Sequence, residues 1–369
     1  MIAMAREPVR YAVVGLGDIA QAAVLPAFVH ARANSRLTAL ISGDPDKLRV
    51  AGNRYGVATR GGYDDFDACL EHVDAVYICT PNAMHAEHAM RAARAGKHVL
   101  CEKPLAVTET QCTRIIETCR ANGVKLMTAY RLHFEAISLE ILSRVRRGDI
   151  GEPRFFTSTF SMKVRPGGFR TQRELGGGTL FDLGVYCINA ARVLFGAEPT
   201  HVSAHAISGA RSGMPEIEDT AAALLRFSGD RVATFTTSFN AADTSSYTLV
   251  GTKGAIHAEP AYAYAEPLAY TFSAGDRSQG KKGRRVDQFA AEIAYFSDCI
   301  LHNRLPEPSG EEGARDVRIV RALYASARRG TVVTLKPYAP ERRPSARQAR
   351  SLAPVTKRPA LVHAAPPHD

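Results

Sequence analysis

A glycine-rich turn near the start of this 369-residue chain constrains its fold more than any other feature. Residues 15–20 read G-L-G-D-I-A, a G-x-G-x-x-A pattern that follows the strand-like run 9–14 and opens a helical pattern over 19–33. Glycines in such a turn let backbone N–H groups approach a pyrophosphate at the N-terminus of the helix. The pattern therefore predicts a dinucleotide site within a strand–helix–strand unit. The residues of the turn expected to hold the dinucleotide are Gly15, Gly17, Asp18 and Ile19.

Strands and helices alternate over about the first 130 residues. The expected strands are 9–14, 37–42, 74–80, 98–101 and 124–129, and the expected helices are 19–33, 45–55, 83–95 and 108–122. Such alternation predicts a mostly parallel sheet with right-handed crossovers. We therefore expect an α/β fold whose first domain, residues 1–132, binds a dinucleotide.

The pattern changes after Tyr130. A helix is expected over 134–146, and strand-like runs then follow one another with a single helix, 179–195, among them. The runs are 153–162, 199–209, 217–228, 231–239, 246–251 and 254–259. Without crossover helices, neighbouring strands pair antiparallel. Two helices, 287–303 and 310–328, and a short strand, 331–335, complete a second, α+β domain over residues 133–337.

The end of the chain, residues 338–369, is basic and rich in Pro and Ala. It carries six Arg or Lys against Glu341 and Asp369, and it shows no apolar period. This composition predicts a disordered tail. Much of the net charge of +10 therefore needs no folded nucleic-acid surface, and we expect no nucleic-acid partner.

Composition also bears on the compartment. The seven cysteines form no C-x-x-C pair, which is typical of reduced thiols in a cytosolic protein. No apolar stretch reaches the roughly 18 residues of a membrane span, and residues 1–10 are too polar for a signal peptide. His85 and His88 have helical spacing but lack an evident third ligand, so no metal is expected. The sequence predicts a cytoplasmic protein without a membrane partner.

A second motif, C-E-K-P at residues 101–104, ends a later strand of the same sheet. Ligands of open α/β sheets lie in the crevice at the carboxyl ends of the strands. Lys103 and the dinucleotide are therefore expected to share one cleft. Taken alone, Lys103 could equally be a solvated lysine at a strand end.

The form of the cofactor is indicated by the segment after the second strand, S-G-D-P-D-K-L-R at 42–49. Ser42 can donate to the 2′-phosphate of NADP, and Lys47 and Arg49 can neutralise it. Asp44 would repel that phosphate if it faced it, or it would cap the following helix instead. The basic residues favour NADP over NAD.

A third motif, G-G-G-T-L-F-D-L-G-V-Y at 176–186, places three glycines before a helix that Thr179 can cap. Asp182 and Tyr186 stand four residues apart, so a carboxylate and a phenol share one helical face. An ammonium near a phenol favours its ionised form, so Lys103 beside Tyr186 would make the phenol a proton donor and acceptor. Alone, Tyr186 would more often be a core residue; its occurrence together with the other motifs favours a catalytic role.

These motifs, with T-P-N at 80–82 followed by His85 and Y-R-x-H at 130–133, resemble the glucose–fructose oxidoreductase/inositol dehydrogenase/rhizopine catabolism (Gfo/Idh/MocA) family. The resemblance extends over roughly residues 9–337 and is strongest to the glucose–fructose oxidoreductase branch. It implies a Rossmann domain, then a large open sheet that joins subunits into a homodimer or homotetramer, with NADP bound between them. His133 would be structural or a substrate contact.

The resemblance also implies roles for individual residues. Hydride would pass between the nicotinamide and a sugar, as aldose or pyranose oxidation at C1 or the reverse. The implied catalytic residues are Lys103, Tyr186 and Asp182, and the implied substrate contacts are these three with Arg131. The implied cofactor contacts, beyond the glycine turn, are Ser42, Lys47, Arg49, Thr80, Pro81, Asn82, His85, Glu102, Lys103, Arg131 and Arg170. Phe169 replaces the tryptophan that this family places before that last arginine.

Two other functions remain open at this point. One is a trans-dihydrodiol or D-xylose dehydrogenase, whose relatives also have a tyrosine at the position of Tyr186. The other is a non-catalytic, dinucleotide-sensing protein. Retention of both Lys103 and Tyr186 argues against the sensor.

Overall fold

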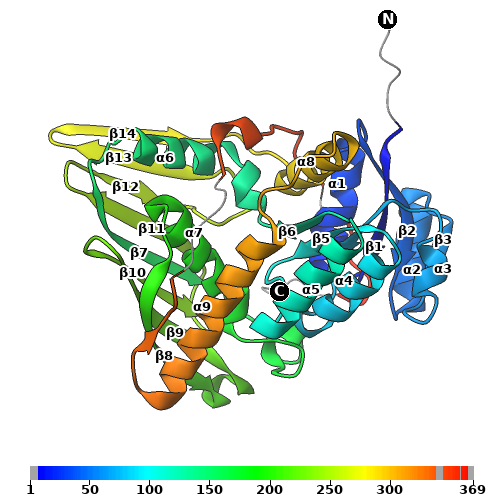
Figure 1. Cartoon of the computed structure of the whole chain (residues 1–369), viewed down its shortest axis with the longest axis horizontal. Coiled ribbons are helices and arrows are strands. Elements are labelled where there is room, and N and C mark those ends of the chain that lie inside the picture. Colours follow the sequence, from blue (N-terminus) through cyan, green and yellow to red (C-terminus); the bar gives the residue numbers. More distant parts are fainter. Residues whose placement is uncertain (1–6, 338–343, 358, 365–369) are drawn as a thin grey trace, which may run out of the picture.

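The structure, a computed structural model, describes residues 7–337, 344–357 and 359–364. Two β-sheets lie side by side, each with its own helices, and the chain passes from the first to the second near residue 130 (Figure 1). The predicted fold class, a Rossmann domain followed by an α+β domain, is confirmed.

The first sheet has six parallel strands in the order β3-β2-β1-β4-β5-β6. Its strands are β1 (Val9–Val14), β2 (Ser35–Ile41), β3 (Thr59–Gly61), β4 (Ala75–Ile78), β5 (His98–Glu102) and β6 (Leu126–Ala129). The order reverses between β1 and β4, since β2 and β3 extend to one side of β1 and β4 to β6 to the other. Ligands bind at the carboxyl ends of the strands beside such a reversal.

Helices cover both faces of this sheet. They are α1 (Leu25–His30), α2 (Pro45–Tyr55), α3 (Phe66–Cys69), α4 (His85–Arg94) and α5 (Glu109–Ala121). Local signals set their ends: the Asp44 side chain caps α2, and Gly56, at a φ of 67°, ends it. The helix expected over 19–33 begins instead with a π-helical turn, Ala20–Val24, directly after the glycine motif. Such turns are frequent at functional sites.

One helix of the first domain comes from far along the chain. Helix α8 (Gln288–Leu301) packs Phe289, Ile293 and Phe296 into the same core as Tyr11 and Phe28. The first domain is therefore not a single continuous segment.

The second sheet has nine strands in the order β14-β13-β12-β11-β7-β10-β9-β8-β15. They are β7 (Pro153–Ser161), β8 (Pro199–Gly209), β9 (Met214–Phe227), β10 (Arg231–Ser238), β11 (Thr244–Gly251), β12 (Ala255–Ala258), β13 (Ala269–Ala274), β14 (Arg277–Lys282) and β15 (Val333–Thr334). Only β7 and β10 pair parallel, so the sheet is mostly antiparallel, as predicted. The hairpin of β13 and β14 was not predicted.

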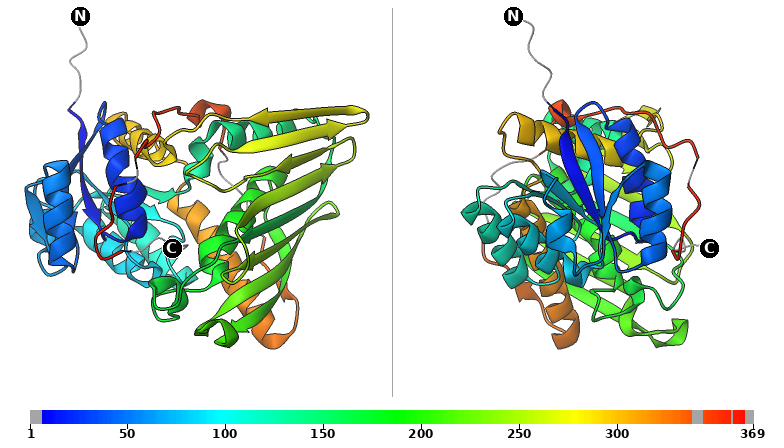
Figure 2. Two further views of the ribbon diagram at one scale, coloured as in Figure 1. Left: turned by 180° about the vertical axis from the view of Figure 1, so that it is seen from behind. Right: turned by 90° about the vertical axis from the view of Figure 1, so that its right-hand side faces the viewer.

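Helices α6 (Ala136–Arg146), α7 (Val185–Phe195) and α9 (Gly310–Arg329) pack on one face of this sheet and form its core (Figure 2). No helix of the described residues covers the opposite face (Figure 2). There, Phe155, Ile207 and Leu224 are 44%, 60% and 42% exposed. The open sheet implied by the family resemblance is therefore present.

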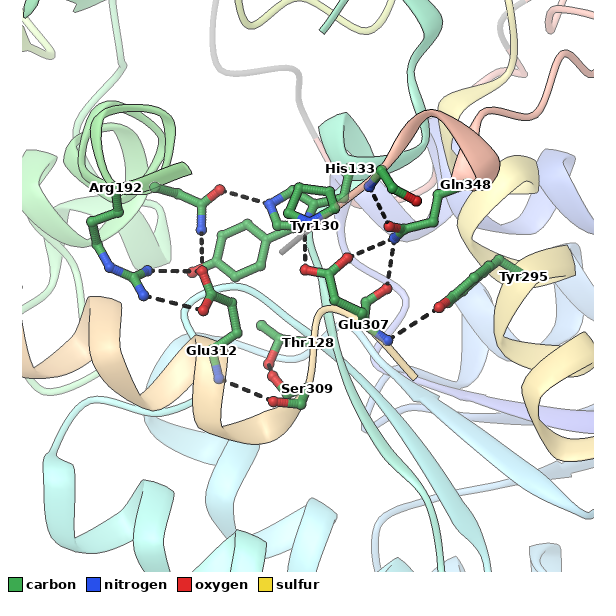
Figure 3. Close-up of polar contacts among 12 residues, drawn as sticks. Thr128, Tyr130, His133, Arg192, Tyr295, Glu307, Ser309, Glu312 and Gln348 are labelled. Carbon is green, nitrogen blue, oxygen red and sulfur yellow. Dashed lines mark hydrogen bonds and ion pairs between the residues drawn. The ribbon is translucent and has the colours of Figure 1, made fainter. Parts of the chain in front are cut away.

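A buried polar network joins Tyr130, at the end of the first domain, to Asp316 and its neighbours in the second (Figure 3). The guanidinium of Arg192, on α7, pairs with Glu312 at 3.0 Å and Asp316 at 2.5 Å, both on α9. His133 lies 3.0 Å from Glu307 Oε1 through Nδ1 and 2.8 Å from Asn189 Oδ1 through Nε2. The sequence allowed two roles for His133, a structural one and a substrate contact. Because both ring nitrogens are engaged in this network, its role is structural.

Part of the predicted disordered tail, residues 344–357 and 359–364, lies against the folded body in this structure. Gln348, in the short helix Ala346–Gln348, is buried and donates to Glu307 O and Oε2 (Figure 3). Arg350 pairs with Asp298, and Leu352 O accepts from the Asp287 N–H. Specific partners on the folded body hold this segment, and apolar periodicity does not detect such partners. The rest of the predicted tail, residues 338–343, 358 and 365–369, lies outside the described residues.

None of the helices in the described part of the chain combines the length and the apolarity that a membrane span requires.

Candidate active site

A cavity of about 760 Å³ lies between the two domains, at the carboxyl ends of the first sheet. Its walls include every predicted site residue except Arg49. These residues are Gly15, Gly17, Asp18, Ile19, Ser42, Lys47, Thr80, Pro81, Asn82, His85, Glu102, Lys103, Arg131, Arg170, Asp182 and Tyr186. Motifs that are separated by up to 171 residues in the sequence therefore meet at one site.

The two glycines of the first turn serve different purposes. Gly15 has a φ of 89°, and a Cβ there would lie 2.8 Å from Thr80 N and 2.9 Å from Cys79 O. The backbone therefore requires glycine at this position. A Cβ at Gly17 would meet no atom within 4 Å, so this glycine leaves open space at the start of the helix. That space fits a pyrophosphate approaching the helix N-terminus.

The sequence left open whether Asp44 caps α2 or faces the 2′-phosphate, and the structure decides between the two. Its Oδ1 atom accepts the N–H groups of Asp46 and Lys47, each at 3.0 Å, so Asp44 caps α2. Ser42 Oγ accepts the Asp44 N–H at 3.2 Å, and Ser42 and Lys47 line the cavity. Arg49 pairs with Asp46 at 2.9 Å on the exposed face of the helix, outside the cavity wall. Of the three residues predicted to hold a 2′-phosphate, Ser42 and Lys47 are in place and Arg49 points elsewhere.

The T-P-N segment offers an unsatisfied group to a ligand. Thr80 Oγ1 is buried and has no hydrogen-bond partner within the described residues, although Thr80 lines the cavity. His85 lies between this segment and the K-P turn, with Nε2 at 2.9 Å from Thr80 O and Nδ1 at 2.8 Å from Pro104 O. Burial lowers the pKa of His85 to about 4, so the neutral ring donates to one of these two carbonyl oxygens at pH 7. His85 therefore positions the segment. The buried donor of Thr80 fits a polar ligand such as a dinucleotide.

Lys103, Asp182 and Arg170 form an ion-paired group at the centre of the cavity. Lys103 Nζ donates to Asp182 O at 2.9 Å and to Oδ1 at 3.1 Å, and Arg170 Nε donates to Oδ2 at 2.7 Å. Burial alone would raise the pKa of Asp182, but the two cations outweigh it and lower the pKa to about 2. Burial likewise opposes the charge on Lys103, but Tyr186 and Asp182 raise the pKa of its ammonium. Both groups are therefore charged at neutral pH.

Tyr186 lies against two cations. Lys103 Nζ is 4.5 Å from the ring centroid, over its face, and Arg131 Nη2 donates to the phenol oxygen at 3.3 Å. Arg131 also donates to Tyr262 O at 2.5 Å and to the Gln288 side chain. The predicted proximity of Lys103 and Tyr186 is present. Arg131, predicted as a substrate contact, is 5% exposed, and these bonds direct its guanidinium toward Tyr186 and the protein backbone.

The prediction that Thr179 caps the next helix is wrong. Thr179 has helical backbone angles, and its hydroxyl lies 2.9 Å from Thr237 Oγ1. Glu218 Oε1, on β9, instead accepts the Leu180 N–H at 3.0 Å and the Tyr324 hydroxyl at 2.7 Å. The first turn, Leu180–Gly184, is π-helical and contains Asp182. A carboxylate about 40 positions away in the sequence gives no local signal of capping.

The sequence analysis did not predict that the carboxyl groups of Glu102 and Glu292 lie close together. The Tyr77 hydroxyl lies 3.0 Å from Glu102 Oε1 and 2.5 Å from Glu292 Oε1, which comes from α8. Burial raises the pKa of Glu292 well above its usual value, and the Glu102 charge raises it further. Burial raises the pKa of Glu102 as well, but Lys103 opposes that rise, so of the two carboxyls Glu292 holds its proton more firmly. The return of α8 to the first domain, which creates this pair, leaves no mark in the local sequence.

A family model described as the oxidoreductase family with an NAD-binding Rossmann fold matches residues 9–130. The GFO/IDH/MocA C-terminal domain matches residues 139–257. The chain belongs to the Gfo/Idh/MocA oxidoreductase family. The predicted family and its class of activity are thereby confirmed, and the closer likeness to the glucose–fructose oxidoreductase branch stays a prediction.

Relatives in the Gfo/Idh/MocA family match nearly the whole chain. The D-xylose 1-dehydrogenase (NADP⁺) of Haloarcula marismortui is 31% identical, over 89% of this chain and 93% of its own length. The crystal structure of aldose-aldose oxidoreductase from Caulobacter crescentus, complexed with glycerol, is similar with a TM-score of 0.85 and 36% identity, covering 89% of this chain and 100% of that one. A 3-ketoreductase from Actinomadura kijaniata in complex with NADP and TDP-benzene gives a TM-score of 0.80 and 30% identity, covering 87% and 98%.

Proposed function

We propose that this protein is an NADP-dependent oxidoreductase that moves a hydride between the nicotinamide and a sugar, by oxidising an aldose or pyranose at C1 or by the reverse reaction. The observation that carries the proposal is the meeting of Lys103, Asp182 and Tyr186 in a cavity whose other end presents Ser42 and Lys47. A xylose dehydrogenase and a ketoreductase, both named with NADP, and an aldose-aldose oxidoreductase among its relatives support the cofactor and the substrate class.

The cavity is suited to NADP along its length. Gly17 leaves room at the helix N-terminus, Thr80 offers a buried hydroxyl, and Ser42 and Lys47 offer donors for a 2′-phosphate. Glu102, which accepts the Lys103 N–H, would bind the hydroxyls of the nicotinamide ribose. When bound, NADP supplies or accepts the hydride.

Proton transfer would fall to Tyr186. In its ionised form, whose negative charge would lie between Lys103 and Arg131, the phenol oxygen can take the proton of the reacting hydroxyl and become neutral. In the reverse direction the phenol returns that proton to a carbonyl oxygen. Asp182 fixes the Lys103 ammonium and, with Arg170, presents polar groups to the other hydroxyls of the sugar.

The D-xylose 1-dehydrogenase reaction is the second candidate for the substrate. It is favoured by the relative from Haloarcula marismortui and by a D-xylose 1-dehydrogenase (NADP⁺) of Haloferax volcanii that is 28% identical over 88% of the chain. A dinucleotide-sensing protein would need no proton-transfer group, yet Lys103 and Tyr186 lie together in the cavity.

An absorbance assay of reduced nicotinamide tests the function. Purified protein with NADP should form NADPH on addition of glucose or xylose, and fructose added afterwards should consume it if one enzyme carries both half-reactions. Failure of NADP to bind, or absence of NADPH formation with a panel of aldoses, would contradict the proposal. Faster reduction with xylose than with glucose would favour the second candidate.

The open face of the second sheet is proposed to join subunits into a dimer or tetramer. Phe155, Ile207 and Leu224 would be buried there on association. Sedimentation of wild type and Leu224→Glu tests this, because the variant should shift to a lower mass. We also propose a cytoplasmic location, since all seven cysteines are buried and unpaired, as in a reducing compartment.

A further inference from the structure

The C-terminal segment 359–364 reaches the dinucleotide end of the site from the far end of the chain. Gln348 anchors the preceding segment in the buried network (Figure 3), and the chain then runs past α8 toward the first helices (Figure 2). Val362 N donates to Gln21 Oε1 at 2.8 Å, and Gln21 Nε2 donates back to Val362 O at 2.9 Å. Gln21 Nε2 also donates to Leu16 O, in the glycine turn, at 2.9 Å. The segment is therefore tied directly to the turn that would hold the pyrophosphate.

The next residue, His363, contacts the helix cap beside the proposed 2′-phosphate position. Its Nδ1 atom lies 2.9 Å from Asp44 Oδ2. His363 has a φ of 43°, in the left-handed region that residues with a side chain adopt at a cost. Two contacts hold that conformation: the backbone of Val362, just before it, bonds Gln21, and the His363 ring itself contacts Asp44.

These contacts occupy both oxygens of the Asp44 carboxylate. Oδ1 accepts two backbone N–H groups of α2, while Oδ2 faces His363 at 2.9 Å and Lys47 Nζ at 3.8 Å. The Lys47 N–H, and then the contacts with His363 and Lys47, lower the pKa of Asp44 in spite of its partial burial. Asp44 is the acidic residue whose charge would repel a 2′-phosphate near Ser42 and Lys47.

We propose that His363 is a cofactor-specificity residue, which holds the Asp44 carboxylate in its capping orientation and so admits the 2′-phosphate of NADP. This inference rests on the proposed NADP site. Without His363, Oδ2 keeps only the more distant Lys47 Nζ and can turn toward the phosphate. The ribose of NAD has a hydroxyl in place of that phosphate and is not repelled, so its binding is not weakened.

The test measures dissociation constants for NADPH and NADH by their fluorescence. His363→Ala should weaken NADPH binding at least about fivefold and leave NADH binding unchanged or tighter. His302→Ala, which removes another exposed histidine at the end of α8, is the matched control and should change neither. A chain ending at residue 364 should match wild type.

A double-variant cycle separates this role from general support of the structure. Asparagine also caps helices, so Asp44→Asn removes the charge and keeps the cap. In that background His363→Ala should have no further effect on NADPH binding. An equal loss in both backgrounds, or an unchanged NADPH-to-NADH ratio in His363→Ala, would overturn the inference.

Two outcomes have other meanings. Wild type that binds neither nucleotide would refute the proposed function itself. The ligand atoms of Asp44, Asp46 and His363 lie within 4.8 Å of one another, a spacing that also suits a metal ion. Titrations with and without EDTA distinguish the two, and an effect of His363→Ala that EDTA abolishes would also overturn the inference.

Discussion

The ammonium of Lys103 lies over the face of the Tyr186 ring, 4.5 Å from its centre. The phenol oxygen is contacted from another side by Arg131 Nη2. The two cations therefore contact different parts of the tyrosine: Lys103 lies over the ring face, and Arg131 contacts the hydroxyl oxygen. Lys103 and the tyrosine hydroxyl can each contact a substrate oxygen without displacing the other.

Lys103→Met should lower kcat by at least about 10²-fold while leaving the dissociation constant for NADP within about threefold of wild type. The variant should fold, because Arg170 still pairs with Asp182 at 2.7 Å. Steady-state kinetics with the best aldose and a NADPH titration provide the two values. Lys125→Met, which removes an ammonium bound to Asn303, is the control and should retain wild-type turnover. Normal turnover in Lys103→Met would remove the lysine from the mechanism.

Tyr186→Phe isolates the phenol oxygen, because the ring and its contact with Lys103 remain. Turnover should again fall by at least about 10²-fold, with little change in melting temperature, since Arg131 keeps its bonds to Tyr262 O and Gln288. Tyr55→Phe, at the end of α2, should be silent in the same assay. A Tyr186→Phe enzyme as fast as wild type would mean that another group carries the proton.

The two glycines of the first turn should respond oppositely to the same substitution. Gly15→Ala places a Cβ against Thr80 N and Cys79 O at a positive φ, and it should cost about 2–4 kcal/mol of unfolding free energy. The Cβ of Gly17→Ala would meet no atom of another described residue within 4 Å beyond its chain neighbours, so stability should stay within about 1 kcal/mol while NADPH affinity falls at least tenfold. Urea unfolding and NADPH titration of both variants check this. Equal effects of the two on affinity at unchanged stability would contradict the assignment.

The local signals in this chain predicted most of the first domain, but they missed strand β3, helix α3 and the return of α8. Apolar runs, helix ends and the spacing of the glycines predicted the parallel sheet and a cleft shared by Lys103 and the dinucleotide, whereas the role of Tyr186 in that cleft came from the family resemblance. Asp44 illustrates the limit, because its sequence context allowed either a cap or a phosphate-facing charge. Only the positions of the α2 N–H groups and of His363 decide between them.

What could not be predicted depends on partners that are distant in sequence. Glu218 replaces Thr179 as the cap of a helix about 40 residues before it, and Gln348 finds Glu307 across the network. Strand β14, Arg277–Lys282, is exposed at every position, so it has no alternation to detect. Arg49 has the right charge for a phosphate, but Asp46 on the same helix holds it on the outer face.

Acid should remove a defined part of the stability through Asp182. The pKa of this carboxyl is about 2 in the folded protein and near 3.8 ordinarily, so the charged form contributes about 2 kcal/mol above pH 4. That contribution is lost as the pH falls from about 4 to about 2. Urea unfolding of wild type and Asp182→Asn between pH 6 and pH 3 should show a stability difference that shrinks with acidification. A difference independent of pH would contradict the ion-pair assignment.

Glu218 should be the stabilising cap of the catalytic helix. Glu218→Leu leaves the Leu180 N–H and the Tyr324 hydroxyl without their acceptor, and it should cost about 2–4 kcal/mol of unfolding free energy. Glu218→Gln keeps one acceptor oxygen and should cost no more than about half as much. Thermal unfolding of the two variants tests the cap. A leucine variant as stable as the glutamine variant would show that the acceptor oxygen at position 218 does not stabilise the helix.

The placement of α8 has a consequence for the biogenesis of this enzyme. Phe289, Ile293 and Phe296 fill the core that Tyr11 and Phe28 begin. During translation, the ribosome must therefore release the chain beyond Leu301 before the nucleotide-binding half can close. Until then the unfilled apolar surface of the first domain is exposed to chaperones. The nascent chain therefore cannot bind its coenzyme before α8 has been synthesised.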